Sequence, residues 1–496
     1  MRRAAPWALA ATAGVALALA FPGPGLWPLV LIVPGLLLEA GRRAEGRWGP
    51  LLAGWLAGTA HWLIAAHWVL PVVIHYGGLS LPAAIPSIIG AAAILGAFWA
   101  AALWVTTRVR PALQPWLLPS LWVLLDALRR LEPFRFPWHP VAVAGADQPW
   151  SLASLPVWGA SGLSWALLAV GAGGWAILRP DSRRSGVAAV TVALGLVGLF
   201  TILAPAALPA SGSLTVALIQ PGTSLEEKWD PEAWPEVVDR VWRLSREAAR
   251  QGEADLILWP EGAVPYRLES DSLYLRQVAD LAAELGVRIV LNSIAPAGAD
   301  GAANAAYVVG REGIEGPRYD KMRLVPFGEY VPAWAGLIFP QALVREVGRF
   351  TPGRNPVALQ AQVPMGMAIC YEVVFPGLAV GQVRQGAELL SSLTNDGWYG
   401  DSWAPHQHLA HAVLRAVETR RWLVRAALTG VSAAIDPSGR VVGSMEIGRS
   451  GVLLAEVAPA IGQTPRVRWG DWWLGVCALL VAACAVAEAR GKGRSR

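Results

Sequence analysis

The strongest constraint on this chain is a series of apolar segments that fills its first 206 residues. A helix needs about 20 apolar residues to cross the hydrocarbon core of a bilayer. Some of the segments are shorter, so their boundaries are soft, and residues 7–21 also fit a cleaved signal peptide. We expect seven membrane-spanning helices, at residues 7–21, 26–40, 51–74, 81–105, 116–128, 157–178 and 186–206. An eighth is expected near the C-terminus, at residues 469–487.

The composition agrees with a membrane protein. The chain is 54% hydrophobic and 16% charged, whereas soluble domains carry about 25% charged residues. The net charge of +5 raises the question of a nucleic-acid partner. However, many basic residues lie in short loops between apolar segments and in the tail at 490–496, where they orient a membrane protein. We therefore expect no nucleic-acid partner.

The basic loops predict an orientation. Arginines occur in every second loop, at Arg2 and Arg3, Arg42, Arg43 and Arg47, Arg108 and Arg110, and Arg179, Arg183 and Arg184. Such loops remain on the cytoplasmic side. Arg129, Arg130 and Arg135 are the exception, and we assign them to a long interfacial segment, 129–158, on the outer side. Seven spans that start inside place the residues after Pro205 outside the cytoplasm.

Between residues 213 and 457 charged residues become frequent, and strand-like runs alternate with amphipathic helices. This alternation predicts an α/β sandwich. The expected strands are 214–220, 255–259, 288–293, 305–309, 366–370, 388–394, 431–436 and 451–457, and helices are expected at 232–251 and 270–285. The predicted organisation is a membrane domain (1–206), an extracytoplasmic catalytic domain (213–457), a closing transmembrane helix (469–488) and a basic cytoplasmic tail (489–496).

Three stretches of the α/β region carry candidate chemistry. Leu256-Ile-Leu-Trp-Pro-Glu261 places a carboxylate directly after a strand. The mostly irregular segment 319–332 holds Lys321 and Glu329, and Met365-Gly-Met-Ala-Ile-Cys-Tyr-Glu372 ends a strand on Cys370, with a helix expected to follow. The other cysteines, Cys477 and Cys484, lie in the C-terminal apolar run. Each residue alone fits a structural role, but together they supply a base, a cation and a thiol.

These stretches resemble the nitrilase superfamily of carbon–nitrogen hydrolases, whose catalytic set is Glu, Lys and Cys on an αββα sandwich. Combined with the apolar segments, nearly the whole chain resembles the apolipoprotein N-acyltransferase family. Further matching stretches are Phe136-Pro-Trp138, Gln220-Pro-Gly with Trp229, Thr394-Asn-Asp-Gly-Trp-Tyr399, Gln407-His408, and Arg415-Ala-Val-Glu418 with Arg420. The short first span departs from the family pattern.

The resemblance implies a role for each residue. Cys370 is expected to take an acyl group from a phospholipid as a thioester and to pass it to the amine of a diacylglyceryl-modified lipoprotein. Glu261 would be the general base, Lys321 would stabilise negative charge, and Glu329 would support Lys321 or the proton relay. Supporting or substrate-contact positions are expected at Tyr371, Glu372, Trp229, Trp398 and Tyr399. No cofactor and no metal is expected, and the location would be the inner membrane of a bacterium.

Two other functions fit parts of the sequence. A membrane-anchored amidohydrolase would use the same three residues but give the acyl group to water, and an anchor needs one span rather than eight. A transporter would keep ionisable residues inside spans, and the few candidates, Asp126, His61 and His67, are expected near an interface. His406, His408 and His411 are clustered, but neither Cys nor an acidic residue is placed to complete a zinc site. Packing or hydrogen bonding is expected for His408.

Overall fold

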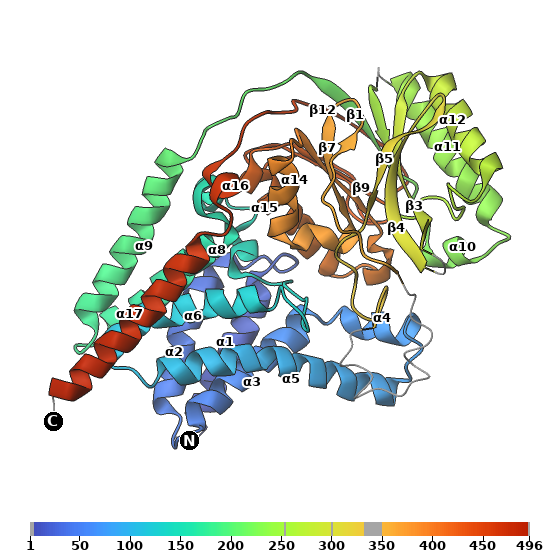
Figure 1. Cartoon of the computed structure of the whole chain (residues 1–496). Helices are drawn as coiled ribbons and strands as arrows, with labels where there is room; N and C mark the ends of the chain where they lie inside the picture. Colours follow the sequence, from blue (N-terminus) through green and yellow to red (C-terminus); the bar gives the residue numbers. More distant parts are fainter. Residues whose placement is uncertain (1–3, 252–253, 299–300, 332–349, 495–496) are drawn as a thin grey trace. The chain divides into compact units, whose positions relative to one another are not determined.

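The computed structural model describes residues 4–251, 254–298, 301–331 and 350–494. The chain divides into two compact units. The first comprises Met1–Ala204, Ser402–Ala410 and Asp471–Arg496, and the second comprises Pro205–Asp401 and His411–Gly470. In Figure 1 the first unit contains the blue and teal helices and the red C-terminal helix, and the second contains the strands.

The first unit is helical. Its main helices are α1 (Ala5–Ala20), α2 (Val33–Arg43), α3 (Gly49–Ala65), α4 (Val69–His75), α5 (Leu81–Thr106), α6 (Gln114–Leu128), α8 (Leu155–Ile177), α9 (Arg183–Leu203) and α17 (Trp473–Arg494). Short turns η1 (Trp27–Leu31), η2 (Pro111–Leu113), η3 (Val141–Gly145) and α7 (Pro149–Leu152) join them. Among the described residues, four helices, α5, α8, α9 and most of α17, are long and apolar enough to cross a membrane. These helices fit a membrane protein.

One expected span is broken. We predicted a single helix over residues 51–74, but α3 ends at Ala65 and α4 continues at an angle of 61°. Pro71 explains the break, because it has no N–H to donate to the carbonyl of His67 and its ring clashes there. If the bent pair is one span, the number of candidate spans rises to five. The shorter helices α1, α2 and α6 have 16, 11 and 15 residues, so the seven-span topology stays a prediction.

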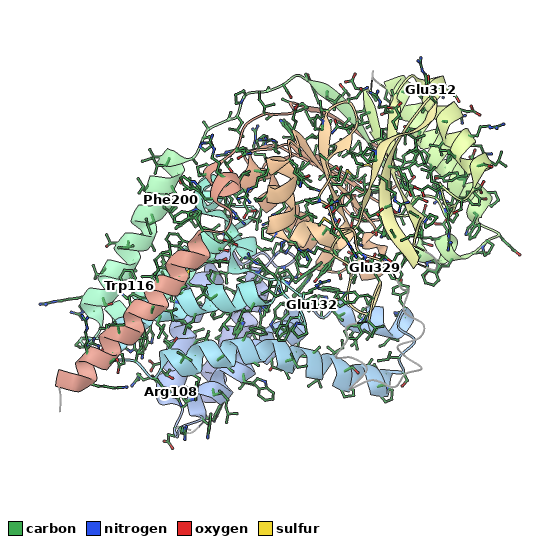
Figure 2. The ribbon with its side chains drawn as sticks, in the orientation of Figure 1. Arg108, Trp116, Glu132, Phe200, Glu312 and Glu329 are labelled. Atoms are coloured by element: carbon green, nitrogen blue, oxygen red, sulfur yellow. The ribbon has the colours of Figure 1, made fainter. Side chains whose placement is uncertain are left out.

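Close helix packing holds the first unit together. A Cβ added at Gly14 would lie 2.2 Å from the carbonyl oxygen of Ala57, so α1 and α3 approach at a glycine. Figure 2 labels Trp116 on α6 and Phe200 on α9, which pack in a cluster with Trp473 of α17. Contact at small residues lets helix backbones approach closely without a hydrophobic driving force between them.

Two of the ionisable residues noted in the apolar segments, Asp126 and His61, are buried in the first unit. Their expected position near a membrane interface stays a prediction. Asp126 accepts a hydrogen bond from Arg129 Nη2 at 2.5 Å, one helical turn away. The arginine neutralises the carboxylate, which explains how an acidic residue is tolerated in an apolar interior.

The second unit is built on two six-stranded sheets. One sheet has the order β12-β1-β2-β3-β4-β5, and its strands are β1 (Leu214–Gln220), β2 (Leu256–Leu258), β3 (Arg288–Ala297), β4 (Gly301–Gly310), β5 (Gly313–Asp320) and β12 (Gly451–Val457). The other has the order β11-β10-β9-β8-β7-β6, with β6 (Leu359–Gln360), β7 (Pro364–Ile369), β8 (Leu389–Thr394), β9 (Leu423–Ala427), β10 (Ala433–Ile435) and β11 (Val441–Ser444).

Alternation along the strands creates two apolar layers. In β1, Val216 and Leu218 face the second sheet, in a core that includes Met367 and Leu393. Residues between them face the other way, into a core shared with α11 (Trp234–Gln251) and α12 (Ser272–Leu285). On the second sheet α14 (Pro376–Arg384) packs against β7, and α15 (Ala404–Thr419) connects η6 (Asp396–Tyr399) to β9. The predicted αββα sandwich is confirmed.

The sequence pattern did not predict four of the observed strands. β5, β6 and β11 lie at or next to sheet edges, where Gly, Pro and charged residues are tolerated and the two-residue apolar period is weak. β9 is central but contains Arg425, which interrupts an otherwise apolar run. Its charge is buried against Asp396, with Nη2 and Oδ2 2.6 Å apart. Asp396 comes close to Arg425 only in the folded sheet, so the sequence pattern could not predict this strand.

Candidate active site

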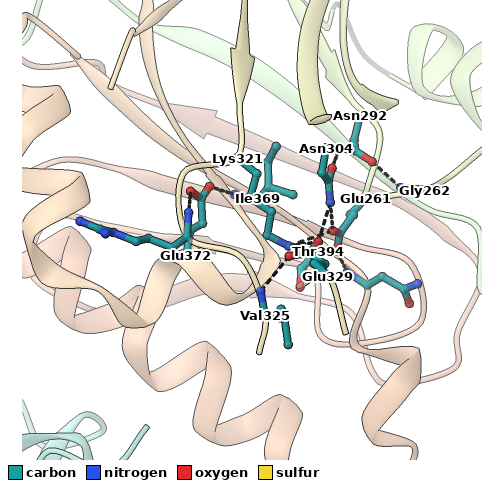
Figure 3. Close-up of polar contacts among 12 residues, drawn as sticks. Glu261, Gly262, Asn292, Asn304, Lys321, Val325, Glu329, Ile369, Glu372 and Thr394 are labelled. Carbon is teal, nitrogen blue, oxygen red and sulfur yellow. Dashed lines mark hydrogen bonds and ion pairs between the residues drawn. The ribbon is translucent and has the colours of Figure 1, made fainter. Parts of the chain in front are cut away.

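Four strand ends of the second unit meet between the two sheets. Glu261 follows β2 and Lys321 follows β5 on one sheet, while Cys370 follows β7 and Asn395 follows β8 on the other. Rigid strands fix the positions of the residues that follow them. The structure therefore brings Glu261, Lys321 and Cys370 together from positions far apart in the sequence, as Figure 3 shows for the polar contacts around Glu261 and Lys321.

Lys321 lies between two carboxylates. Its ammonium is 2.8 Å from Glu329 Oε1 and 3.4 Å from Glu261 Oε1, and the side chain is 1% exposed. Glu329 is itself held by the backbone N–H of Val325, which donates to Oε2 at 2.9 Å. Both carboxylates thus fix the ammonium, and Figure 3 shows Glu329 and Glu261 converging on it.

Two asparagines align the carboxylates. Asn304 Nδ2 on β4 donates to Glu261 at 2.8 Å and to Glu329 at 3.0 Å. Asn292 Nδ2 on β3 donates to Asn304 Oδ1 at 2.6 Å, and its own Oδ1 accepts from the N–H of Gly262 at 3.0 Å. This chain of hydrogen bonds decides which way each amide faces, and it therefore fixes the orientation of Glu261.

The second sheet also contacts Glu261. The backbone N–H of Asn395 donates to Glu261 Oε2 at 3.1 Å. The turn that carries this N–H is held by the buried Asp396–Arg425 ion pair and by the side chain of Asn395, which caps the N–H of Gly397. Glu261 is therefore clamped from both sheets.

The charges set the protonation states. Burial raises the pKa of a carboxyl group, but the charge of Lys321 and the hydrogen bond from Asn304 outweigh it and hold the pKa of Glu261 below its ordinary value. Burial lowers the pKa of an ammonium, but Glu261 and Glu329 outweigh it and raise the pKa of Lys321. At neutral pH Glu261 is ionised and Lys321 is charged.

Cys370 is held in a strained conformation. The strand ends at Ile369, one residue earlier than expected, and Cys370 has φ +52°, in the left-handed region that non-glycine residues rarely adopt. The expected helix does not follow at once, because η5 (Cys370–Val374) intervenes before α14. Such strain gathers at functional sites. The sharp turn directs the sulfur toward Glu261, whose pKa is lowered in part by a hydrogen bond with the thiol.

The thiol is protonated in this state. Burial raises the pKa of Cys370, and the nearby charge of Glu261 raises it further, while Lys321 acts in the opposite direction. A thiol with a raised pKa is a poor nucleophile until a base removes its proton. The ionised carboxylate of Glu261 is placed to do so.

Glu372 lies behind the site and is fully buried. Its carboxylate accepts hydrogen bonds from the hydroxyl of Tyr319 and from the backbone N–H groups of Met322, Arg323 and Ile369, at 2.7–3.0 Å. These bonds join the loop that follows Lys321 to the turn that carries Cys370. Glu372 therefore acts as a structural link between the two segments.

The pKa of Glu372 predicts a pH-dependent stability. Burial raises this pKa to about 7, against an ordinary value of 4.5, and the backbone donors oppose the rise. A raised carboxyl pKa favours the folded state below pH 4.5, and this contribution is lost as pH rises through 7. One pKa unit corresponds to about 1.4 kcal/mol, so the loss is roughly 3 kcal/mol. Glu372→Gln cannot titrate, so its thermal midpoint should fall less than the wild type's between pH 5 and 8. Equal falls would contradict the assignment.

The expected substrate-contact residues occupy different environments. Trp229, at the end of α10 (Leu225–Trp229), is 64% exposed and meets Trp398 in a T-shaped contact with centroids 6.0 Å apart. Tyr399 lies near the thiol: burial raises the pKa of Tyr399, and a thiolate at Cys370 would raise it further. Tyr371 is buried and packs edge-on against Phe375 at 5.4 Å.

Several functional candidates were missed from the sequence. Asn292 and Asn304 lie within strands that carry no signal of their own, and the stretch 394–399 was noted without a role for the N–H of Asn395. Lys228 was missed although it precedes Trp229, which was noted. His408 packs against Trp138 with ring centroids 5.5 Å apart. Within the described ranges, no group of three or more His, Cys, Asp or Glu is placed to hold a metal ion.

The second unit, with its buried site, belongs to the carbon–nitrogen hydrolase superfamily. The family model for Carbon-nitrogen hydrolase matches residues 215–466, and that for the Apolipoprotein N-acyltransferase N-terminal domain matches residues 13–173. Proteins named apolipoprotein N-acyltransferase from Geobacter metallireducens and Pseudomonas syringae are 34% and 33% identical to this chain. Each alignment covers 97% of this chain, with 94% and 96% of the respective relative. The chain therefore belongs to the apolipoprotein N-acyltransferase family and is an acyltransferase.

Among solved structures, an amidase of the nitrilase superfamily from Nesterenkonia AN1 is similar to this chain. It is 19% identical, the alignment covers 54% of this chain and 98% of the amidase, and the TM-score is 0.41.

Proposed function

We propose that this enzyme transfers a fatty acyl group from a membrane phospholipid to the N-terminal amine of a diacylglyceryl-cysteine lipoprotein, through a thioester on Cys370. The observation that carries the proposal is the buried convergence of the Cys370 thiol, the ionised Glu261 and the Lys321 ammonium. Family membership supports the N-acyl transfer, and the site supports the thioester.

The first half-reaction acylates the enzyme. Glu261 takes the thiol proton as the sulfur attacks the ester carbonyl, and Lys321 stabilises the oxyanion. The carbon–oxygen bond then breaks, Glu261 returns its proton to the leaving alkoxide, and lysophospholipid departs. The acyl group remains on sulfur, and Glu261 is again ionised.

The second half-reaction removes the acyl group from Cys370. The neutral amine of the lipoprotein attacks the thioester carbonyl, and Glu261 accepts a proton from the attacking nitrogen. The carbon–sulfur bond breaks, and the thiolate recovers that proton. Because donor product leaves before the acceptor reacts, the cycle is ping-pong and needs no cofactor.

A location in the membrane suits an enzyme whose two substrates both carry long acyl chains. Burying one CH₂ group in lipid is worth about 0.8 kcal/mol, so drawing a sixteen-carbon chain into water costs about 12 kcal/mol. We propose that the protein lies in the bacterial inner membrane with residues 213–457 on the extracytoplasmic side, as the arginine-rich loops favour. A reporter fused after Val457 should be active outside the cytoplasm, and activity only inside would contradict this orientation.

The test of the function is to detect the intermediate. Purified protein incubated with phospholipid alone should gain one fatty acyl group on Cys370, and hydroxylamine should release it. Adding a lipidated peptide with a free N-terminal amine should then transfer the group to the peptide. An acyl group that passes only to water would favour the amidohydrolase. An intermediate that forms only with both substrates present would contradict the ping-pong cycle.

A further inference from the structure

A second lysine reaches the site from α10. Lys228 extends over Gly262, the residue after Glu261, and a Cβ added at Gly262 would lie 2.2 Å from Lys228 Nζ. Gly262 also has φ +62°. The absence of a side chain at this position therefore leaves the space that the ammonium occupies, beside the carboxylate that serves as base.

The helix is anchored, but the ammonium is not. A capping box at Ser224, an ion pair between Glu227 and Arg240 at 2.8 Å, and a hydrogen bond from Trp234 Nε1 to the carbonyl of Lys228 fix α10. Within the part of the chain that the structure describes, the ammonium of Lys228 takes part in no hydrogen bond or ion pair. Burial lowers its pKa, whereas the charge of Glu261, and that of Cys370 when it is a thiolate, would raise it.

The charge balance of the site requires a second cation besides Lys321. Lys321 already faces two carboxylates, Glu261 and Glu329. When the thiol proton moves to Glu261, one negative charge moves to sulfur and then to the carbonyl oxygen, while Glu329 still occupies Lys321. Without another cation the site would carry a net negative charge, which opposes both anions in a buried environment.

The use of lysine supports a specific role. The chain has 41 basic residues, of which only three are lysines, Lys228, Lys321 and Lys492. Two of the three therefore lie at the site. Lysine is a compact charge whose pKa responds to burial, whereas arginine remains charged and prefers planar, two-point partners.

We propose that Lys228 is a charge-compensating residue, whose ammonium balances the Cys370 thiolate and the oxyanion while Lys321 is matched by Glu329. This inference rests on the proposed function, because it requires Cys370 to be the nucleophile. The two cations then have different roles. Lys321 is held in place by Glu261 and Glu329, and Lys228 stabilises the negative charge that forms on the sulfur and on the carbonyl oxygen during the reaction.

The test follows the reactivity of Cys370 in the full-length protein. Alkylation of this residue by iodoacetamide, which is neutral, is measured by mass spectrometry as a function of pH. The titratable groups that face the thiol are Glu261, Lys321, Lys228, Asp396 and Tyr399. In Lys228→Met the pH profile should move upward by about one unit, and single-turnover acylation by phospholipid should slow at least about tenfold.

Matched variants separate charge from folding. Lys228→Arg keeps the positive charge in a larger group, so its activity should lie between that of the wild type and that of Lys228→Met. Lys228→Gln gives a second neutral variant if the methionine variant folds poorly. Arg246→Met removes the same charge from the exposed side of α11, where Arg246 pairs with Glu284, and it should leave the profile unchanged. If Arg246→Met and Lys228→Met behave alike, the effect is not specific to the site and the proposal is wrong.

A donor comparison excludes a phosphate-binding role. Acylation by a p-nitrophenyl ester, which has no phosphate, should fall by the same factor in Lys228→Met as acylation by phospholipid. A loss confined to phospholipid would mean that Lys228 binds the phosphate, and would overturn the inference. If the wild-type protein formed no acyl group on Cys370 with any donor, the proposed function itself would fail.

Discussion

Replacing Cys370 with alanine is expected to abolish acyl-enzyme formation and amine acylation while the protein still inserts into the membrane. The thiol supplies the bond that carries the acyl group, and no other thiol lies at the site: Cys477 and Cys484 are on α17 in the other unit. The measurement is mass spectrometry of the purified variant after incubation with phospholipid, together with transfer to a lipidated peptide.

Two variants make this result specific. Cys484→Ala should retain wild-type acylation, because its thiol lies outside the catalytic unit. Cys370→Ser should be inactive in transfer, because a hydroxyl is less acidic than a thiol and an ester is a poorer acyl donor to an amine than a thioester. Full transfer by Cys370→Ala would rule out the thioester route.

Replacing Glu261 with glutamine is expected to slow acylation by about 10²–10⁴-fold, the usual effect of losing a general base. The thiol is protonated at rest because burial and Glu261 raise its pKa, so attack depends on a group that accepts the proton. The amide keeps the volume of the carboxylate and can still accept from the N–H of Asn395. Single-turnover acylation by phospholipid measures the effect.

Glu329→Gln is the matched control, because Glu329 shares both Lys321 and Asn304 with Glu261. This variant loses the same charge from the same network, whereas the base assigned to the thiol is Glu261, whose carboxylate forms a hydrogen bond with it. Its acylation should therefore fall much less. A larger loss for Glu329→Gln than for Glu261→Gln would exchange the roles assigned to the two carboxylates.

Local sequence signals predicted the layers of the fold because they reflect short-range physics. β1 and β12 match their expected bounds, since each has an apolar pattern that fits a buried strand. The pattern did not predict β9, because Arg425 in that strand needs a partner 29 residues away. It wrongly predicted one unbroken helix over residues 51–74, because Pro71 interrupts the hydrogen bonding of an otherwise apolar run. The errors arise where one residue overrides the pattern around it.

The sequence by itself determined the acyltransferase class and the αββα fold, because motif order and hydrophobic periodicity are properties of the chain. It also nominated Glu261, Lys321 and Cys370, whose roles stay predictions. Only the tertiary structure decided how they are held: Asn292 and Asn304 align the carboxylates, Asn395 reaches Glu261 from the opposite sheet, and Lys228 stands over Gly262. Hydrogen bonds and charge balance depend on distances in space, and spacing along the chain does not encode them.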